Sequence, residues 1–186
     1  YEARVLEDAE DGDTAGWDVY YAALGTITNA TDPEQASNRI IQLQPDTTTG
    51  FRFTIAGSID DWTKLSWRML GTDNYRVYIS CTTALGHRYL KYMPGTFTPY
   101  LLGEYIHHPF GSLGNGKWDT FLRDAATDLT SVEPANSLLS IDAILFTGVS
   151  SVDDIVTYTY VDTDGDTLPD ALETPLGLDP TNPADA

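Results

Sequence analysis

The sequence contains a single cysteine, Cys81, and few basic side chains. One thiol cannot form an internal disulfide, so the fold must rest on a hydrophobic core. The chain has 10 lysines and arginines against 28 aspartates and glutamates, which gives a formal net charge of −18. Such a surface repels DNA, RNA and anionic lipid, so we expect no nucleic-acid partner.

Long apolar runs are also missing from the sequence. No stretch of about 18 apolar residues occurs, so we expect no membrane-spanning helix and no membrane partner. With 186 residues, the chain is long enough for one sizeable core and a short appendage. An aromatic fraction of 11% is too high for a disordered acidic chain. The chain begins at Tyr1 without a signal peptide, and we expect it to be a mature or excised piece of a longer protein.

Short strands are the secondary structure that the sequence favours between residues 65 and 161. Segments rich in β-branched and aromatic residues alternate with turn signals such as GTDN, MPG, GSLGNGK and TGVSS. These segments are LSWRML, YRVYIS, HRYLKYM, EYIHH, WDTFLRD, IDAILFTG and IVTYTYV. RDAATDLTSVE favours one or two turns of helix. The pattern predicts an all-β domain, a β-sandwich, over residues 1–160, followed by a separate segment, 161–186.

The second segment begins with VDTDGDTLPDALETP, in which acidic residues alternate with others. Ca²⁺ takes roughly 6–8 oxygen ligands, and an EF-hand-type loop supplies them at fixed alternate positions. Counted from Asp162, those positions hold Asp162, Asp164, Asp166, the Leu168 carbonyl, Asp170 and Glu173. The glycine that such a loop usually has at its sixth position is replaced by Thr167. The spacing predicts a Ca²⁺ site, and a disordered acidic linker is the alternative.

This pattern, followed by GLDPTNP, resembles the bacterial thrombospondin type 3 repeat. The resemblance implies a Ca²⁺-stapled spacer between modules of a secreted or cell-surface protein. Carboxylates this close repel one another without a cation, so we expect the loop to order only when Ca²⁺ is bound.

Short motifs at both ends of the expected sandwich resemble those of jelly-roll carbohydrate-binding modules. They are AEDGDTAGW near the start and SVDDIVTY near the end, with GKWDTFLRDA between them. The resemblance implies a jelly roll whose first and last strands lie side by side, joined by a structural Ca²⁺. It makes Glu10 and Asp154 the expected ligands, with Asp8 and the carbonyls around Asn38 as weaker candidates. A solvated acidic rim without metal is the alternative.

The middle of the chain is locally basic. Residues 62–103 hold five basic side chains against the single acid Asp73. Because side chains alternate across a strand, the expected strands separate into two faces. The core face holds Trp67, Val77, Ile79, Cys81, Leu90 and Ile106, with Cys81 as a small buried thiol. The other face holds Arg68, Arg76, Tyr78, Tyr89, Lys91, Tyr105 and His107.

Such a face suits a sugar polymer that carries negative charge. Aromatic rings stack on sugar rings, tyrosine hydroxyls bond to sugar hydroxyls, and arginine matches carboxylate or sulfate oxygens. We therefore expect a non-catalytic carbohydrate-binding module that binds an acidic or sulfated polysaccharide through these seven residues. We expect it to belong to a larger secreted polysaccharide-degrading enzyme that carries a catalytic domain. An ordinary exposed sheet face is the alternative.

Two other functions remain open on the sequence. A small jelly-roll polysaccharide lyase would use Arg68 to neutralise a uronate and Tyr105, His107 or His108 to remove its proton. The chain is short for such an enzyme, and its middle strands show no paired carboxylates of the kind a glycosidase needs. The second alternative is a structural or adhesive surface module without sugar specificity.

Overall fold

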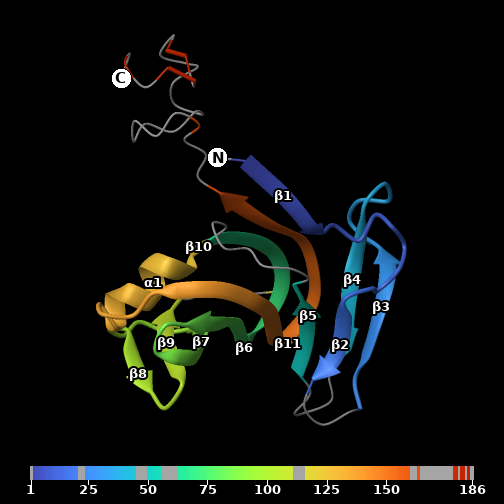
Figure 1. The fold of residues 1–186 in the computed structure, drawn as a ribbon. Coiled ribbons are helices and arrows are strands. Elements are labelled where there is room, and N and C mark those ends of the chain that lie inside the picture. The colour runs from blue at the N-terminus through green and yellow to red at the C-terminus, as the bar shows by residue number, and fades with distance from the viewer. Residues whose placement is uncertain are drawn as a thin grey trace.

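The computed structural model describes residues 2–20, 24–44, 50–55, 63–110 and 116–159, with residues 163, 178–179, 181–182 and 184. These ranges contain strands and one short helix (Figure 1). The elements are β1 (Glu2–Glu7), β2 (Trp17–Tyr20), β3 (Thr26–Thr31), β4 (Arg39–Gln44), β5 (Gly50–Thr54), β6 (Lys64–Thr83), β7 (Gly86–Met93), β8 (Tyr100–Leu102), β9 (Tyr105–Pro109), β10 (Trp118–Asp124), α1 (Ala125–Val132) and β11 (Leu138–Thr159).

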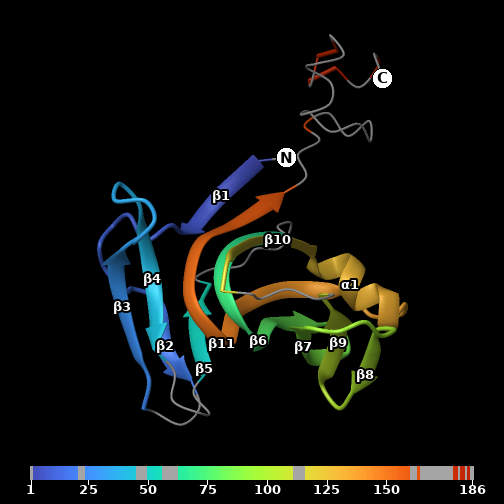
Figure 2. The same cartoon turned by 180° about the vertical axis from the view of Figure 1, so that it is seen from behind.

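Two long strands, β6 and β11, run through both layers of a β-sandwich. In the first layer, residues 64–70 of β6 pair with β10 and with the second half of β11, which also pairs with β1 and β4. In the second layer, the remainder of β6 pairs with β7 and with the first half of β11. That layer has the order β2-β5-β11-β6-β7-β9-β8. Figures 1 and 2 show both long strands curving from one layer into the other.

The bend in β11 depends on Gly148. Its φ of +69° lies in the left-handed region that side chains rarely adopt. A Cβ at this position would stand 2.9 Å from the Cα of Tyr75, in the bend of β6. The two bends therefore pack backbone against backbone, and only glycine fits between them.

The core lies between the two layers. Trp67 of the first layer is fully buried and faces Tyr92 of the second, with 6.3 Å between the ring centroids. Trp67 also stacks on Phe121 at 5.5 Å. Burial of large aromatic side chains contributes strongly to the stability of a domain without disulfides.

Helix α1 covers one end of this core. It begins at the N-cap Asp124, whose side chain accepts a hydrogen bond from the Thr127 amide, and it buries Ala125 and Leu129. No helix in the described part of the chain has the length and apolar character needed to cross a lipid bilayer.

The all-β jelly-roll prediction is confirmed, and the expected strands and short helix are present. First and last strands lie side by side as expected, since β1 pairs with β11 from Glu2 opposite Thr159 onward. The expected turns GTDN and TGVSS are wrong, because residues 71–74 and 147–151 are bends inside continuous strands. Cys81 is buried, and burial raises the pKa of its thiol, so it is an unreactive core residue.

Candidate functional site

A groove crosses the outer face of the second layer. Its volume is about 550 Å³. We call it the tyrosine groove, and it is lined by Tyr20, Gly50, Tyr78, Tyr89, Lys91, Leu102, Tyr105, His107, Leu145 and Thr147. The strands that supply these residues extend from β2 to β8, across the whole width of the layer.

Strand alternation places these side chains opposite the core. On β6, Tyr78 lies between the buried Val77 and Ile79, and it faces outward. On β7, Tyr89 and Lys91 flank the buried Leu90 in the same way. Parallel pairing of β9 with β7 sets Tyr105 beside Tyr89 and His107 beside Lys91. Five of the seven residues predicted to bind polysaccharide therefore line one groove: Tyr78, Tyr89, Lys91, Tyr105 and His107.

Three tyrosine rings form the central surface of the groove. Tyr89 and Tyr105 are stacked, with centroids 5.1 Å apart and planes 15° apart. The Tyr78 ring meets both edge-on, at 6.3 and 6.2 Å. Burial, followed by a hydrogen bond with Tyr20, raises the pKa of Tyr89 to about 12. Burial also raises the pKa of Tyr78, so both hydroxyls remain protonated and can donate hydrogen bonds at neutral pH.

Positive charge in the groove comes from Lys91 and the nearby Arg76. The Lys91 ammonium lies 5.6 Å from the centroid of Tyr78 and 5.9 Å from that of Tyr105. Burial, and then the Arg76 charge, lower the pKa of Lys91. The Arg76 guanidinium donates to the carbonyls of Asn74 and Tyr75. Among the described residues, neither Lys91 nor Arg76 forms an ion pair with a carboxylate.

His107 forms part of the groove wall as a neutral ring. It is 6% exposed, and Tyr100 stacks on it with centroids 4.5 Å apart and planes 9° apart. Burial, and then the Lys91 charge, lower the pKa of His107, so it carries no proton charge at neutral pH. Its Nδ1 is buried and has no hydrogen-bond partner among the described residues.

The other side of the groove was not predicted from the sequence. Arg52 on β5 forms two hydrogen bonds to the Asp18 carboxylate of β2, each 2.9 Å long. The Arg52 guanidinium also lies over the Tyr20 ring, 5.1 Å from its centroid. This ion pair neutralises Arg52 and holds Tyr20 at the groove. No local sequence pattern predicts that these residues lie at the groove, because β2 and β5 reach it only by pairing with each other and with β11.

Arg68 lies outside the groove. It belongs to the first-layer half of β6, where its Nη1 is 3.0 Å from Asp153 and 3.5 Å from Asp154. Its guanidinium stacks over Trp118 at 4.8 Å. The expectation that Arg68 shares a face with Tyr78 and Lys91 is wrong, because β6 bends between the two positions.

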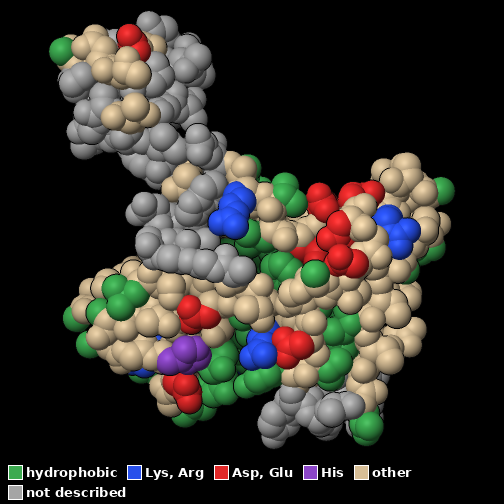
Figure 3. All heavy atoms as spheres, turned by 45° about the vertical axis from the view of Figure 1, so that its right-hand side comes forward, with side chains coloured by type: hydrophobic (Ala, Val, Ile, Leu, Met, Phe, Trp, Pro, Cys, Tyr) green, Lys and Arg blue, Asp and Glu red, His purple; other side chains and the backbone are tan. Residues whose placement is uncertain are grey.

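Acids from β10 and from the C-terminal end of α1 neutralise much of the basic segment. Lys64 faces Asp124 at 3.9 Å, and Arg88 binds Glu133 at 2.7 Å. In Figure 3, a group of acidic side chains lies in the upper right of the view, and others lie in its lower half beside a histidine and a basic side chain, among exposed hydrophobic side chains. The local excess of positive charge in the sequence is thus reduced in the fold to the groove itself.

The residues proposed for a lyase do not assemble. His108 is 2% exposed and faces the core, where its ring stacks on Tyr92 at 5.5 Å. Arg68 lies in the other layer. Of the four residues that a lyase would use, only Tyr105 and His107 line the groove.

The predicted metal ligands fall into two groups. Asp162, Asp164, Asp166, Leu168, Asp170 and Glu173 lie outside the described residues. In the other group, Glu10 accepts a hydrogen bond from the Arg39 amide, and Asp8 accepts one from the Glu10 amide. Asp154 is occupied by Arg68. Among the described residues, no group of three or more His, Cys, Asp or Glu side chains is arranged to hold a metal ion, and a Ca²⁺ site that uses Glu10 and Asp154 together with backbone carbonyls stays a prediction.

The acidic motifs near the chain ends have other partners. Glu7 is buried and accepts hydrogen bonds of 2.7 Å from both the Ala9 amide and the Trp17 indole. Asp153 is fully buried and accepts bonds from Asn38 and Arg68, each 3.0 Å long. The segments that hold these motifs therefore also supply two buried carboxylates, Glu7 and Asp153, which were not predicted as site residues.

No protein-family model and no curated protein matches this sequence. Among solved structures, the chain is similar to the family 11 carbohydrate-binding module of the cellulosomal cellulase Lic26A-Cel5E of Clostridium thermocellum. That match has a TM-score of 0.50 and 15% identity, and covers 85% of this chain and 95% of the other. The CBM22-2 xylan-binding domain of Paenibacillus barcinonensis Xyn10C matches with a TM-score of 0.44 and 17% identity over 82% and 98% of the two chains. The similarity to the family 11 module shows that the two chains share the jelly-roll β-sandwich fold.

Proposed function

We propose that the chain is a non-catalytic carbohydrate-binding module that holds an acidic or sulfated polysaccharide in the tyrosine groove. The observation that carries this proposal is the position of Lys91. Its ammonium lies among tyrosine rings without a carboxylate partner among the described residues. A carboxylate or sulfate on a bound sugar would supply that partner. A solved structure that shares this fold, the family 11 module, is itself a carbohydrate-binding module.

The groove has the other properties that a polysaccharide requires. Tyr89 and Tyr105 present a stacked aromatic surface, and the tyrosine hydroxyls donate hydrogen bonds. From β2 to β8 the layer contains six strand spacings. At about 4.8 Å each they amount to about 29 Å along the curved sheet, so an extended oligosaccharide can cross it. Binding at one such site is weak, and linked modules would add avidity.

Affinity electrophoresis tests the proposal with alginate and chondroitin sulfate as acidic probes and a mixed-linkage β-glucan as the neutral probe. We expect retardation by an acidic probe that weakens as salt rises, because exposed charge pairs are screened. Arg76→Ala should flatten the salt dependence, whereas Tyr78→Ala should weaken binding at every salt concentration. Equal retardation by the neutral glucan would contradict the acidic specificity, and no retardation by any probe would favour an adhesive or structural module.

A lyase is the second candidate, and Tyr105 beside His107 in the groove is the observation that keeps it open. Incubation with alginate separates the two functions, since a lyase releases unsaturated products that absorb ultraviolet light and a binding module releases none. We expect no increase in absorbance.

We also propose that residues 162–173 bind Ca²⁺ and that the chain belongs to a secreted or cell-surface polysaccharide-degrading enzyme. Support comes from the alternate spacing of carboxylates in the sequence. Calorimetric titration of the full chain should show saturable Ca²⁺ binding that Asp164→Ala removes. Absence of heat with Ca²⁺, or an unchanged titration of the variant, would contradict this site.

A further inference from the structure

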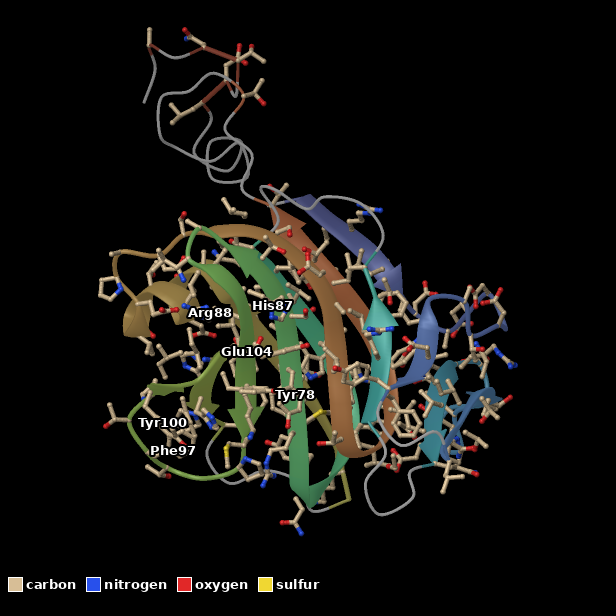
Figure 4. The ribbon with its side chains drawn as sticks, turned by 60° about the horizontal axis from the view of Figure 1, so that its bottom comes forward. Tyr78, His87, Arg88, Phe97, Tyr100 and Glu104 are labelled. Carbon is tan, nitrogen blue, oxygen red and sulfur yellow. The ribbon has the colours of Figure 1, made fainter. Side chains whose placement is uncertain are left out.

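Three side chains form a hydrogen-bonded chain at one end of the tyrosine groove. Ser80 Oγ lies 2.9 Å from His87 Nε2, and His87 Nδ1 lies 3.3 Å from Glu104 Oε2. They come from β6, from β7 and from the turn between β8 and β9. Figure 4 shows His87 and Glu104 close together, with Tyr78 farther along the same face. None of the three was predicted to belong to the site.

This chain touches the stacked tyrosines at both ends. The His87 ring meets the Tyr89 ring edge-on, with centroids 4.5 Å apart. Glu104 directly precedes Tyr105, and its carbonyl accepts a hydrogen bond of 2.9 Å from the Tyr89 amide. Ser80 is the cross-strand partner of Tyr89. The two rings on which a sugar would stack are therefore connected through His87 and Glu104 as well as through their own contact.

The chemistry of the three groups fixes the orientation of the imidazole. A carboxylate only accepts hydrogen bonds, so the proton that faces Glu104 belongs to His87 Nδ1. In the neutral imidazole, the other ring nitrogen, Nε2, then accepts from the Ser80 hydroxyl. With both nitrogens engaged, the ring cannot flip without losing two hydrogen bonds. An edge contact that is held in this way keeps Tyr89 in place against Tyr105.

We propose that Glu104 and His87 are positioning residues that set the Tyr89–Tyr105 stack in the geometry that receives a sugar ring. This inference rests on the proposed function of the groove. Binding sites lose affinity when the groups that support the contacting side chains are loosened, even when every contacting side chain is still present. The same order of atoms occurs in serine hydrolases. Here Ser80 is only 8% exposed on β6, the strand that pairs with the strand of Tyr89, which favours a supporting role over attack on a substrate.

The experiment compares four variants of the full chain by affinity electrophoresis in alginate and in mixed-linkage β-glucan. Glu104→Ala should weaken binding of the retarding probe by about tenfold, because it removes a hydrogen bond to a charged group. Glu104→Gln should recover most of this loss, since its amide oxygen can still accept from His87. His87→Phe keeps a ring against Tyr89 without hydrogen bonds and should bind as weakly as Glu104→Ala.

The matched control is Glu133→Ala. Glu133 binds Arg88, the residue next to His87 on β7, but its side chain and that of Arg88 do not line the groove. We expect this variant to bind like the wild type well below its melting temperature, even if it melts earlier. Melting curves of all four variants identify any that are unfolded at the temperature of the binding assay.

Several outcomes would overturn the inference. If the wild type is retarded and Glu104→Ala is retarded equally, the positioning role is wrong but the proposed function stands. If the wild type itself is not retarded by either probe, both the positioning role and the proposed function are wrong. Wild-type affinity in His87→Phe would show that ring packing suffices without the hydrogen bonds. Covalent labelling of Ser80 by a fluorophosphonate would assign these three residues to catalysis instead.

Discussion

The two outer faces of the sandwich are built from the same long strands, but the basic side chains on them have different partners. On the first layer, Arg68 is held by Asp153 and Asp154, and Lys64 faces Asp124. On the second layer, the ammonium of Lys91 lies among tyrosine rings. Both faces are hollowed: the first has a depression of about 750 Å³ and the second the tyrosine groove of about 550 Å³.

The two faces therefore do not differ in whether they have a depression. They differ in the partners of their basic side chains. A basic side chain that is matched by an acid from a neighbouring strand has little left to offer a ligand. A basic side chain that is desolvated beside aromatic rings gains when a ligand brings an anion. The depression on the first layer has a single tyrosine, Tyr158, whereas the groove has four.

The largest effect that we expect concerns the paired charges of the first layer. Asp153→Ala would leave Arg68 without its buried partner and would remove one of the two side-chain hydrogen bonds that Asn38 donates. We expect a loss of about 3 kcal/mol in the free energy of unfolding, reduced somewhat by the partial exposure of Arg68. For a chain of this size that corresponds to a decrease of roughly 6–12 °C in the melting temperature. Binding to alginate at low temperature should not change, and a parallel loss of affinity would contradict the separation of the two faces.

The next effect concerns the aromatic surface of the groove. Tyr105→Ala removes one of the two stacked rings, which lies 5.1 Å from Tyr89. Loss of about 80 Å² of apolar contact with a sugar costs about 2 kcal/mol, or roughly 30-fold in affinity. Calorimetry with alginate oligosaccharides measures this loss. The matched variant on the first layer is Tyr158→Ala, and an equal loss there would mean that the ligand also uses the other face.

Strand alternation predicted which side chains share a face, because a period of two residues is a local property of the backbone. It placed Tyr78, Tyr89, Lys91, Tyr105 and His107 together, and all five line the groove. It also separated them correctly from the buried Val77, Ile79, Leu90 and Ile106. These assignments need only the local sequence and the assumption that the strands are neighbours.

Alternation failed where the chain bends or pairs over a long distance. Arg68 and Arg76 have the same parity in the sequence, but Gly71 and Tyr75 lie at a bend that puts them in different layers. Tyr20 and Arg52 reach the groove only through the pairing of β2 and β5 with β11. Neutralisation of Arg88 by Glu133 joins residues that are 45 positions apart. Such contacts follow from the topology, which no local pattern contains.

Acidification should affect the groove through His107. Burial lowers the pKa of this imidazole in the folded state, whereas the unfolded chain takes up a proton near pH 6.5. The contribution of His107 to stability is therefore complete above about pH 6.5 and decreases as the pH falls below that value. Between pH 6.5 and 5.5 the loss is at most about 1.4 kcal/mol.

Melting curves of the wild type and His107→Gln at pH 7.5 and 5.5 test this sign. The variant should lose less of its stability on acidification. Buried Glu7 and Asp153 have raised pKa values and act in the opposite direction, but they are common to both proteins and cancel in the comparison. An identical decrease in both proteins would exclude His107 as the titrating group.

The smallest effect that we expect is the loss of affinity when one basic side chain is removed from either face. Lys91→Ala should weaken binding to alginate by about fivefold at low salt, since a partly exposed ion pair contributes about 1 kcal/mol. The difference between Lys91→Ala and the wild type should shrink in high salt, where exposed charges are screened. Arg68→Ala removes the same charge from a guanidinium that Asp153 already holds, and it should leave the affinity for alginate unchanged at every salt concentration. An equal, salt-dependent loss in both variants would mean that alginate responds to the total charge of the protein. A loss in Arg68→Ala alone would place the polysaccharide on the first layer, and the partners of a charge would then be a poor guide to the binding face.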